Sequence, residues 1–214
     1  MTNIAEKTNL FIIKNPVIAR AMTLGIVNNR KLARLIMDEE NISSEHGVIS
    51  ALRRYSKKVK DEPLNSSAKL LQNSRISTKS RLAIIKMDRD FQLLANVLPV
   101  VLKLINPSIG GLLRLVEGRE SFKLIVDMDM LEKVEEIVGK DRIHLVVENL
   151  AEINIHLGEG YRKVRGARGL ILQTLALLDV RVGETISCLP EFILLVDQND
   201  VGKAQELLLR LFFN

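Results

Sequence analysis

The chain has 214 residues, with 31 Lys and Arg, 26 Asp and Glu, and 47% hydrophobic residues. This length fits one to three domains, and the composition, with 5 Pro and 12 Gly, excludes a disordered or fibrous chain. The single cysteine excludes a disulfide framework and a multi-cysteine zinc site, so we expect a cytoplasmic protein. No apolar stretch approaches the roughly 20 residues that span a bilayer, and the absence of Trp argues against a base-stacking surface.

The charge is divided unevenly along the chain. Residues 1–81 hold 15 Lys and Arg and 7 Asp and Glu, a net charge of +8, whereas residues 82–214 have a net charge of −3. Such an asymmetry suggests contact with a nucleic acid or a membrane through the front part alone, although a solvated basic helix face would give the same count.

Three helical patterns come first. One opens at Pro16 and stops near Gly25, a second starts at Asn28 or Asn29, and a third starts at Ser43. The second and third, separated by a short turn, predict a helix-turn-helix-like domain over residues 1–63. Residues 64–80 are expected to form a linker or a β-wing.

The basic side chains of this region are candidates for contact with double-stranded DNA. A helix fits the major groove when its outer face is polar and positive, and the third helix carries such residues. The candidates are Arg30, Lys31, Arg53, Arg54, Lys57 and Lys58, with Arg75 and Lys79 from the wing or linker. The alternative is a helical docking or dimerisation unit whose basic face meets only water.

The rest of the chain repeats itself after 70 residues. Phe122–Asp127 aligns with Phe192–Asp197, with four of six positions identical. Each copy predicts strand, helix, strand, strand and helix, and the first copy adds a closing strand near residues 143–147. In the second copy this closing strand is short or missing. We therefore predict an α+β protein in which two ferredoxin-like βαββαβ domains, over residues 81–148 and 149–214, follow the helical domain.

The stretch from Val164 to Asp197 resembles an ACT domain, a small-ligand sensing module of amino-acid metabolism. The whole chain resembles archaeal predicted regulators of amino-acid metabolism, which place a helix-turn-helix-like domain before tandem ACT copies. ACT domains carry a glycine at the start of their first helix, and Gly166 takes that place. The resemblance implies a small-molecule ligand, possibly an amino acid, and pairing of ACT domains edge to edge in a homodimer or higher homo-oligomer.

The ligand-binding residues implied by this resemblance lie around the first helix of the second copy. A glycine at a helix start leaves backbone N–H groups open to a carboxylate. The candidates are Arg165, Gly166, Ala167, Val180, Arg181 and Val182. The 70-residue offset puts Asn96 in the place of Gly166 in the first copy, so the first copy is expected to lack an open helix start.

Enzyme chemistry is not expected. The three histidines have no metal-ligand spacing, and no motif for a cofactor or for catalysis is present. The leading hypothesis is a non-enzymatic, metabolite-responsive regulator that binds DNA through its N-terminal domain and binds no membrane. The alternative is a regulatory subunit that controls an amino-acid biosynthetic enzyme in trans without binding DNA.

Overall fold

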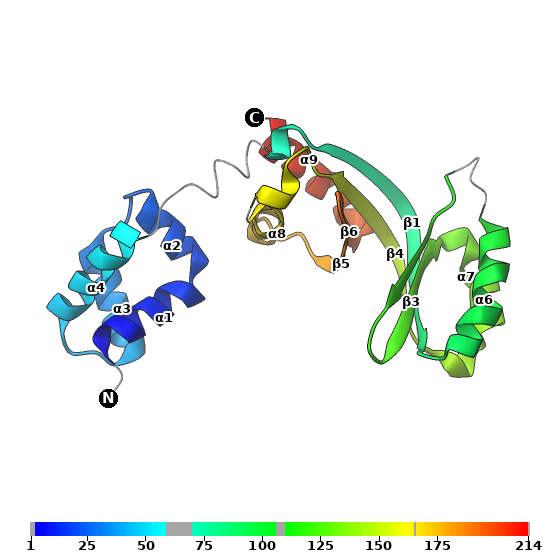
Figure 1. Ribbon diagram of the computed structural model, residues 1–214, viewed down its shortest axis with the longest axis horizontal. Helices are drawn as coiled ribbons and strands as arrows, with labels where there is room; N and C mark the ends of the chain where they lie inside the picture. The colour runs from blue at the N-terminus through cyan, green and yellow to red at the C-terminus, as the bar shows by residue number, and fades with distance from the viewer. Residues whose placement is uncertain (1–2, 59–69, 106–109, 165, 214) are drawn as a thin grey trace. The chain divides into compact units, whose positions relative to one another are not determined.

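The structure, a computed structural model, describes residues 3–58, 70–105, 110–164 and 166–213. The chain divides into two compact units, Met1–Ser66 and Ser67–Asn214. The first unit is helical and the second is built around one antiparallel sheet (Figure 1). The α+β class predicted from the sequence is therefore confirmed.

The first unit contains four helices among its described residues. They are α1 (Ile4–Lys14), α2 (Pro16–Thr23), α3 (Asn29–Glu40) and α4 (Glu45–Lys58). The Asn28 side chain caps α3 by accepting hydrogen bonds from the N–H groups of Arg30 and Lys31, both at 3.1 Å. Asn41 ends α3 in the left-handed conformation, with φ of 51°. The helices enclose a core that includes Phe11, Ile12, Leu32, Ile36, Val48 and Leu52.

Helix α1 is absent from the sequence prediction, which placed the first helix at Pro16. The Asn3 side chain caps α1 by accepting a hydrogen bond from the N–H of Ala5 at 3.1 Å. Phe11 and Ile12 are buried in the core of the unit. Pro16 is typical of a helix start, and here it begins α2, with only Asn15 between α1 and α2.

The second unit is a six-stranded antiparallel sheet in the order β2-β3-β1-β4-β6-β5. Its strands are β1 (Arg75–Asp88), β2 (Leu113–Glu117), β3 (Ser121–Asp127), β4 (Ile143–His156), β5 (Val182–Cys188) and β6 (Glu191–Asp197). Its helices are α6 (Phe91–Leu104), α7 (Leu131–Val138), α8 (Ala167–Leu177) and α9 (Val201–Phe213), with 3-10 turns η2 to η5 between some of these elements. The two repeated segments form β3 and β6, which take equivalent places in this order.

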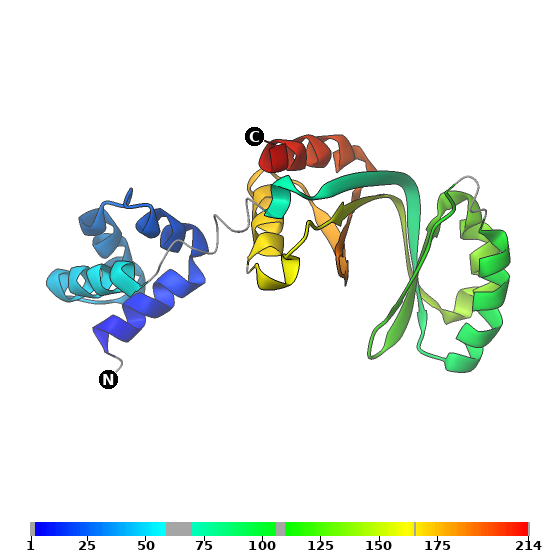
Figure 2. The same ribbon diagram turned by 45° about the horizontal axis from the view of Figure 1, so that its top comes forward.

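Strands β1 and β4 run through both copies of the repeat, which we call the first and the second half of the unit (Figure 2). Both strands have a residue with positive φ where the halves meet, Arg81 at 60° and Asn149 at 57°, and their pairing shifts between Lys79 and Leu82. The boundaries predicted at residues 80/81 and 148/149 therefore fall inside continuous strands, at these irregularities.

The closing strand of the second half comes from the start of the unit. Arg75–Lys79 of β1 pairs with Glu152–His156 of β4, so it completes the sheet on which α8 and α9 pack. These residues were predicted to form a wing or linker, and that prediction is wrong for residues 75–80. Residues 64–69 of the expected linker lie outside the described residues. The sequence prediction left this closing strand short or missing, because sequence order alone assigns each copy its own strands.

Helices cover one face of each half and leave the other faces to pack together. Ala83, Ile85 and Met87 of β1 point toward α6 and α7, whereas Leu82 and Ile84 join Ile125, Leu150 and Leu195 in a separate cluster. Two ion pairs lie among strands that are not neighbours in the sheet. Arg114 of β2 reaches Glu152 of β4 at 2.7 Å, and Lys123 of β3 reaches Glu184 of β5 at 2.5 Å. The sheet is therefore strongly curled.

Candidate functional site

Helix α8 begins with an open N-terminus. Its N-cap residue is Gly166, with φ of 85°, and no side chain caps the helix there. The N–H of Leu170 bonds to the Gly166 carbonyl at 2.8 Å, so the N–H groups of the three preceding residues have no partner one turn back in the helix. Together with the helix dipole, these N–H groups favour an anion.

A cavity of about 630 Å³ lies beside this helix start. It is lined by Leu70, Leu157, Tyr161, Arg162, Val164, Gly166, Ala167, Arg168, Gly169 and Leu189. The lining therefore combines two guanidinium groups and open backbone N–H groups with several aliphatic side chains. A volume of this size is within the range of ordinary small-molecule sites.

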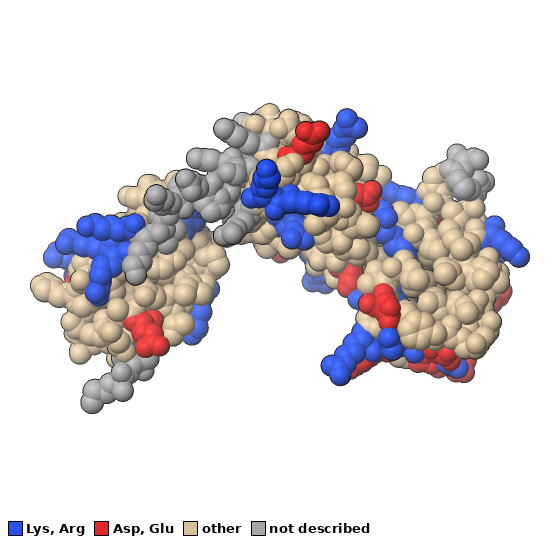
Figure 3. All heavy atoms as spheres, viewed as in Figure 1, with Lys and Arg blue, Asp and Glu red and all other residues tan. Residues whose placement is uncertain are grey.

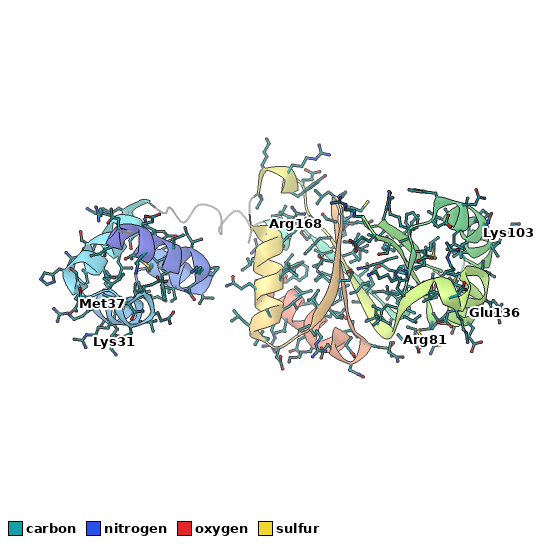
Figure 4. The ribbon with its side chains drawn as sticks, turned by 90° about the horizontal axis from the view of Figure 1, so that it is seen from below. Lys31, Met37, Arg81, Lys103, Glu136 and Arg168 are labelled. Carbon is teal, nitrogen blue, oxygen red and sulfur yellow. The ribbon has the colours of Figure 1, made fainter. Side chains whose placement is uncertain are left out.

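Each of the two arginines of the cavity donates a side-chain hydrogen bond to a hydroxyl group. The Arg168 side chain donates a hydrogen bond to the Ser187 hydroxyl at 3.0 Å, and Figure 4 shows Arg168 at the start of α8. The Arg162 Nε donates to the Tyr161 hydroxyl at 3.2 Å, and its guanidinium lies 5.7 Å from the Tyr161 ring centroid. Guanidinium groups bind carboxylates through paired N–H donors. The cavity therefore offers a carboxylate two kinds of hydrogen-bond donor, the guanidinium groups and the open backbone N–H groups at the start of α8.

The corresponding helix of the first half is closed by a carboxylate of its own. Asp90 caps α6 by accepting hydrogen bonds from the N–H groups of Gln92 at 2.8 Å and Leu93 at 3.1 Å. Arg142 donates a further hydrogen bond to Asp90 at 2.7 Å. The Leu93 N–H and then Arg142 lower the pKa of Asp90 below its usual value. One half thus holds a built-in anion where the other holds an open cavity.

The structure brings together only part of the predicted ligand site. Gly166 and Ala167 line the cavity, whereas Val180, Arg181 and Val182 follow the other end of α8 and are not among its lining residues. Val180 is buried in the core and Arg181 is exposed. An 11-residue helix is about 16 Å long, which separates the two groups. Arg165 lies outside the described residues.

Asn96 does not correspond to Gly166. It lies inside α6, whose first residue is Phe91, whereas α8 begins directly after Gly166. The offset fails here because ten residues separate β4 from α8, whereas two separate β1 from α6. The N-cap residue of the first half is Asp90. Its carboxylate, and not a missing glycine, closes the first helix.

Sequence reasoning left several lining residues out of the ligand site. Tyr161 and Arg162 lie in the segment that leads into α8, where Figure 3 shows Lys and Arg side chains gathered. Leu70 precedes β1 and Leu189 follows β5, so only the folded chain places them next to Gly166. The long segment between β4 and α8 was the one available signal, since a functional loop is often longer than its counterpart.

The candidate DNA-binding residues are distributed over both units. In the first unit, Arg53, Arg54 and Lys57 of α4 are exposed, as are Arg30 and Lys31 of α3, the latter labelled in Figure 4. Arg30 lies 3.5 Å from the carboxylate of Glu45. Lys58 is the last residue of α4, and its side chain lies outside the described part of the chain.

The other two candidates belong to the sheet of the second unit. Arg75 and Lys79 are residues of β1, and Arg75 is exposed. The Lys79 ammonium lies 2.7 Å from the Asp127 carboxylate and donates to the Gly110 carbonyl. The Lys79 charge, which was expected to face a phosphate, thus has a partner within the second unit.

Neither a metal site nor a membrane span is found in the described part of the chain. Residues 3–58, 70–105, 110–164 and 166–213 include no group of three or more His, Cys, Asp or Glu side chains placed to hold a metal ion. The described helices include none that is long and apolar enough to cross a bilayer.

Comparison with solved structures shows what the second unit is similar to. The chain matches aspartate kinase from Clostridium acetobutylicum with a TM-score of 0.53 and 19% identity, over 64% of this chain and 34% of that one. It matches aspartate kinase from Synechocystis with a TM-score of 0.53 and 16% identity, over 66% and 27%. It thus spans about a third of these enzymes or less.

A third similar structure is a regulatory subunit. The regulatory subunit of aspartate kinase from Thermus flavus matches with a TM-score of 0.51 and 12% identity, over 64% of this chain and 96% of that one. The match must include the second unit, because the first has only 66 residues. No protein-family model matches the chain, and no curated protein matches its sequence. The second unit therefore has the fold of an aspartate kinase regulatory subunit.

Proposed function

We propose that the chain is a non-catalytic regulatory protein that binds an amino acid in the cavity beside α8 and controls a biosynthetic enzyme in trans. The observation that carries the proposal is the open N-terminus of α8 next to the two arginines, at the place where α6 is closed by Asp90. A ligand carboxylate would take at α8 the role that the Asp90 carboxylate has at α6.

The remaining walls of the cavity suit the rest of an amino acid. Leu70, Leu157, Val164 and Leu189 present aliphatic carbon, which favours an apolar or long side chain. Arg168 would add a charge-assisted hydrogen bond to the carboxylate, worth about 1.5–3 kcal/mol. The similarity of 64% of this chain to nearly the whole length of a regulatory subunit supports action on a separate enzyme.

A screen of the twenty amino acids by thermal shift tests ligand binding. An amino acid present at 100 times its Kd would stabilise the second unit by about 2.7 kcal/mol. The variant Arg168→Gln is expected to weaken binding about ten- to hundredfold. Arg181→Gln is the matched control, because Arg181 is exposed and does not line the cavity. An unchanged melting temperature with all twenty amino acids would contradict the proposal.

Assembly through the sheet edges completes the proposal. β2 and β5 are the outer strands of the sheet, so each has one side that no strand of this chain covers in the described region. Such edges can pair with a second copy, and we propose a homodimer or higher homo-oligomer. Light scattering on the purified chain would give its molar mass, and a monomer at all concentrations would contradict this part.

Control of an enzyme in trans predicts a complex whose activity responds to the ligand. The partner enzyme would co-purify with the chain in a fixed ratio, and adding the amino acid identified in the screen would change the activity of that enzyme. The proposal would be contradicted if the activity of the captured enzyme stayed the same with every amino acid that binds the chain.

DNA binding by the first unit is the second candidate function. The observation in its favour is the exposed basic group on α4, formed by Arg53, Arg54 and Lys57 (Figure 3 shows the positive charge on this unit). Phosphate contacts would make binding fall steeply with salt. Retention on duplex DNA across a salt series, for the wild type and for Arg53→Ala/Arg54→Ala, tests it, and binding that neither salt nor the double substitution weakens would contradict it.

A further inference from the structure

The chain that enters the second unit forms one wall of the cavity. The boundary between the units follows Ser66, and the described residues resume at Leu70. The Leu70 side chain, 4% exposed, lines the cavity, and Leu71 is fully buried in the core with residues of α8 and α9. The first described residue of the second unit is therefore part of the cavity wall.

One hydrogen bond joins this entry segment, Leu70–Ser74, to the loop after β4, and two more lie within the segment. The Ser74 hydroxyl donates to the Leu70 carbonyl at 2.9 Å and accepts from the Gly158 N–H at 3.1 Å. The Ser74 N–H donates to the Leu71 carbonyl at 3.0 Å. Gly158 directly follows Leu157, another lining residue, so the cavity and the entry segment share one piece of backbone.

Close packing makes this contact sensitive to small changes. A Cβ atom added at Gly158 would lie 2.8 Å from both the Cβ and the carbonyl oxygen of Asn73. Real Cβ atoms are not found at that distance from backbone atoms, so the entry segment would have to shift. Only glycine allows the loop after β4 and the entry segment to approach this closely.

We propose that the ligand holds the entry segment against the cavity and so controls the connection to the first unit. This inference rests on the proposed function and assigns the route by which ligand binding reaches the rest of the chain. A ligand that contacts Leu70 binds the closed segment better than the released one, and that difference in affinity shifts the equilibrium. By reciprocity, any change that releases the segment weakens the ligand by the same factor.

Tryptic cleavage between Lys69 and Leu70 measures release of the segment directly. A protease cuts an extended chain, so the cleavage rate follows the released population when opening is fast. The amino acid that gives the largest shift in the twenty-member screen, added at saturation, is expected to slow cleavage at this bond. The expected slowing is about 5- to 150-fold, the range of ordinary coupling between sites.

Three variants test the reciprocity. Gly158→Ala is expected to speed cleavage after Lys69 without ligand and to raise the Kd of the same amino acid by the same factor. Ser74→Ala removes the two side-chain hydrogen bonds without a clash and is expected to act in the same direction, which keeps the test valid if Gly158→Ala fails to fold. Gly202→Ala in α9 is the matched control, since an added Cβ there meets nothing within 4 Å.

The outcomes separate this inference from the proposed function. Slower cleavage with ligand, together with matching changes in cleavage and Kd in the variants, supports it. An amino acid that binds the wild type but leaves the Lys69–Leu70 cleavage rate unchanged overturns the inference and leaves the proposed function standing. If no amino acid binds, both fail.

Discussion

The ion pair between Arg114 and Glu152 gives the sharpest test of the curled sheet. Arg114 lies on edge strand β2 of the first half, and Glu152 lies on β4 in the second half. Two hydrogen bonds, at 2.8 and 2.7 Å, join the guanidinium to the carboxylate. The Glu152 side chain is 5% exposed and that of Arg114 is 26% exposed. The Glu152 hydrogen bond, followed by its charge, raises the pKa of Arg114.

The substitution Arg114→Ala leaves the Glu152 carboxylate buried without its cation. Removing one partner of a fully buried pair costs about 3–5 kcal/mol. Because Arg114 is one quarter exposed, water reaches the site and we expect a loss of about 2–3 kcal/mol in the free energy of unfolding. Glu152→Ala is expected to cost less, since the arginine left behind can be hydrated. The double variant is expected to lose about as much as Arg114→Ala alone, a coupling of about 1–2 kcal/mol.

Urea unfolding of the four proteins of this cycle measures the coupling. The chain has two tyrosines and no Trp, so in a Tyr55→Phe background the fluorescence of Tyr161 reports the second unit alone. The control pair is Arg210 and Glu206 on α9, with side chains 69% and 63% exposed, for which about 0.3–0.5 kcal/mol is expected. Equal coupling energies in the two cycles would refute a curl that brings β2 to β4.

Three further substitutions probe the two helix starts and the core. Asp90→Asn keeps a capping side chain but loses the charge. Because the pKa of Asp90 is lowered below 3.8, the ionised carboxylate stabilises the folded state above that pH. The difference between the urea midpoints of the wild type and the variant is therefore expected to shrink as the pH falls toward 3. A constant gap would contradict this. Gly166→Ala puts a side chain at φ of 85° and is expected to cost about 1–2 kcal/mol in urea unfolding, whereas Gly169→Ala, with open space around its Cβ, is expected not to destabilise. Phe212→Ala empties a fully buried site and is expected to cost about 3–5 kcal/mol; a loss as small as that of Phe213→Ala, whose side chain is 58% exposed, would contradict the placement of α9.

The repeat could be predicted because its strongest segment has a fixed place in the fold. Phe122–Asp127 and Phe192–Asp197 form β3 and β6, which lie between an edge strand and a long central strand in each half. Their nearly continuous apolar residues are typical of strands that are packed on both faces. Both faces of β3 and β6 are covered in the structure.

The exchange of the closing strand could not be predicted from local pattern. Arg75–Lys79 has a polar, basic sequence that is typical of a linker, and its place in the second half is set by pairing with β4, about 75 residues later. The irregularities at Arg81 and Asn149 give no warning either, since positive φ is usually marked by glycine. Tertiary pairing therefore decided what local preference left open.

The candidate site divides in the same way. Gly166 could be predicted because a glycine before an apolar helix has a known physical use. Leu70 and Leu189 could not, because their contact with α8 exists only after the sheet has formed. The capping role of Asp90 is readable from sequence once the start of α6 is known, but a constant offset between the copies hid it.

The central claim is that a ligand carboxylate occupies the start of α8. Isothermal titration calorimetry on the full chain tests this claim most directly. The chain is titrated once with the amino acid found in the screen and once with the carboxamide of that amino acid. The two ligands differ only at the carboxyl group, where the amide lacks the negative charge and one acceptor oxygen that the α8 N–H groups and Arg168 would recognise. The carboxamide is expected to bind at least about tenfold more weakly, the loss expected for one charged hydrogen bond. Equal affinities of the acid and the amide would contradict it.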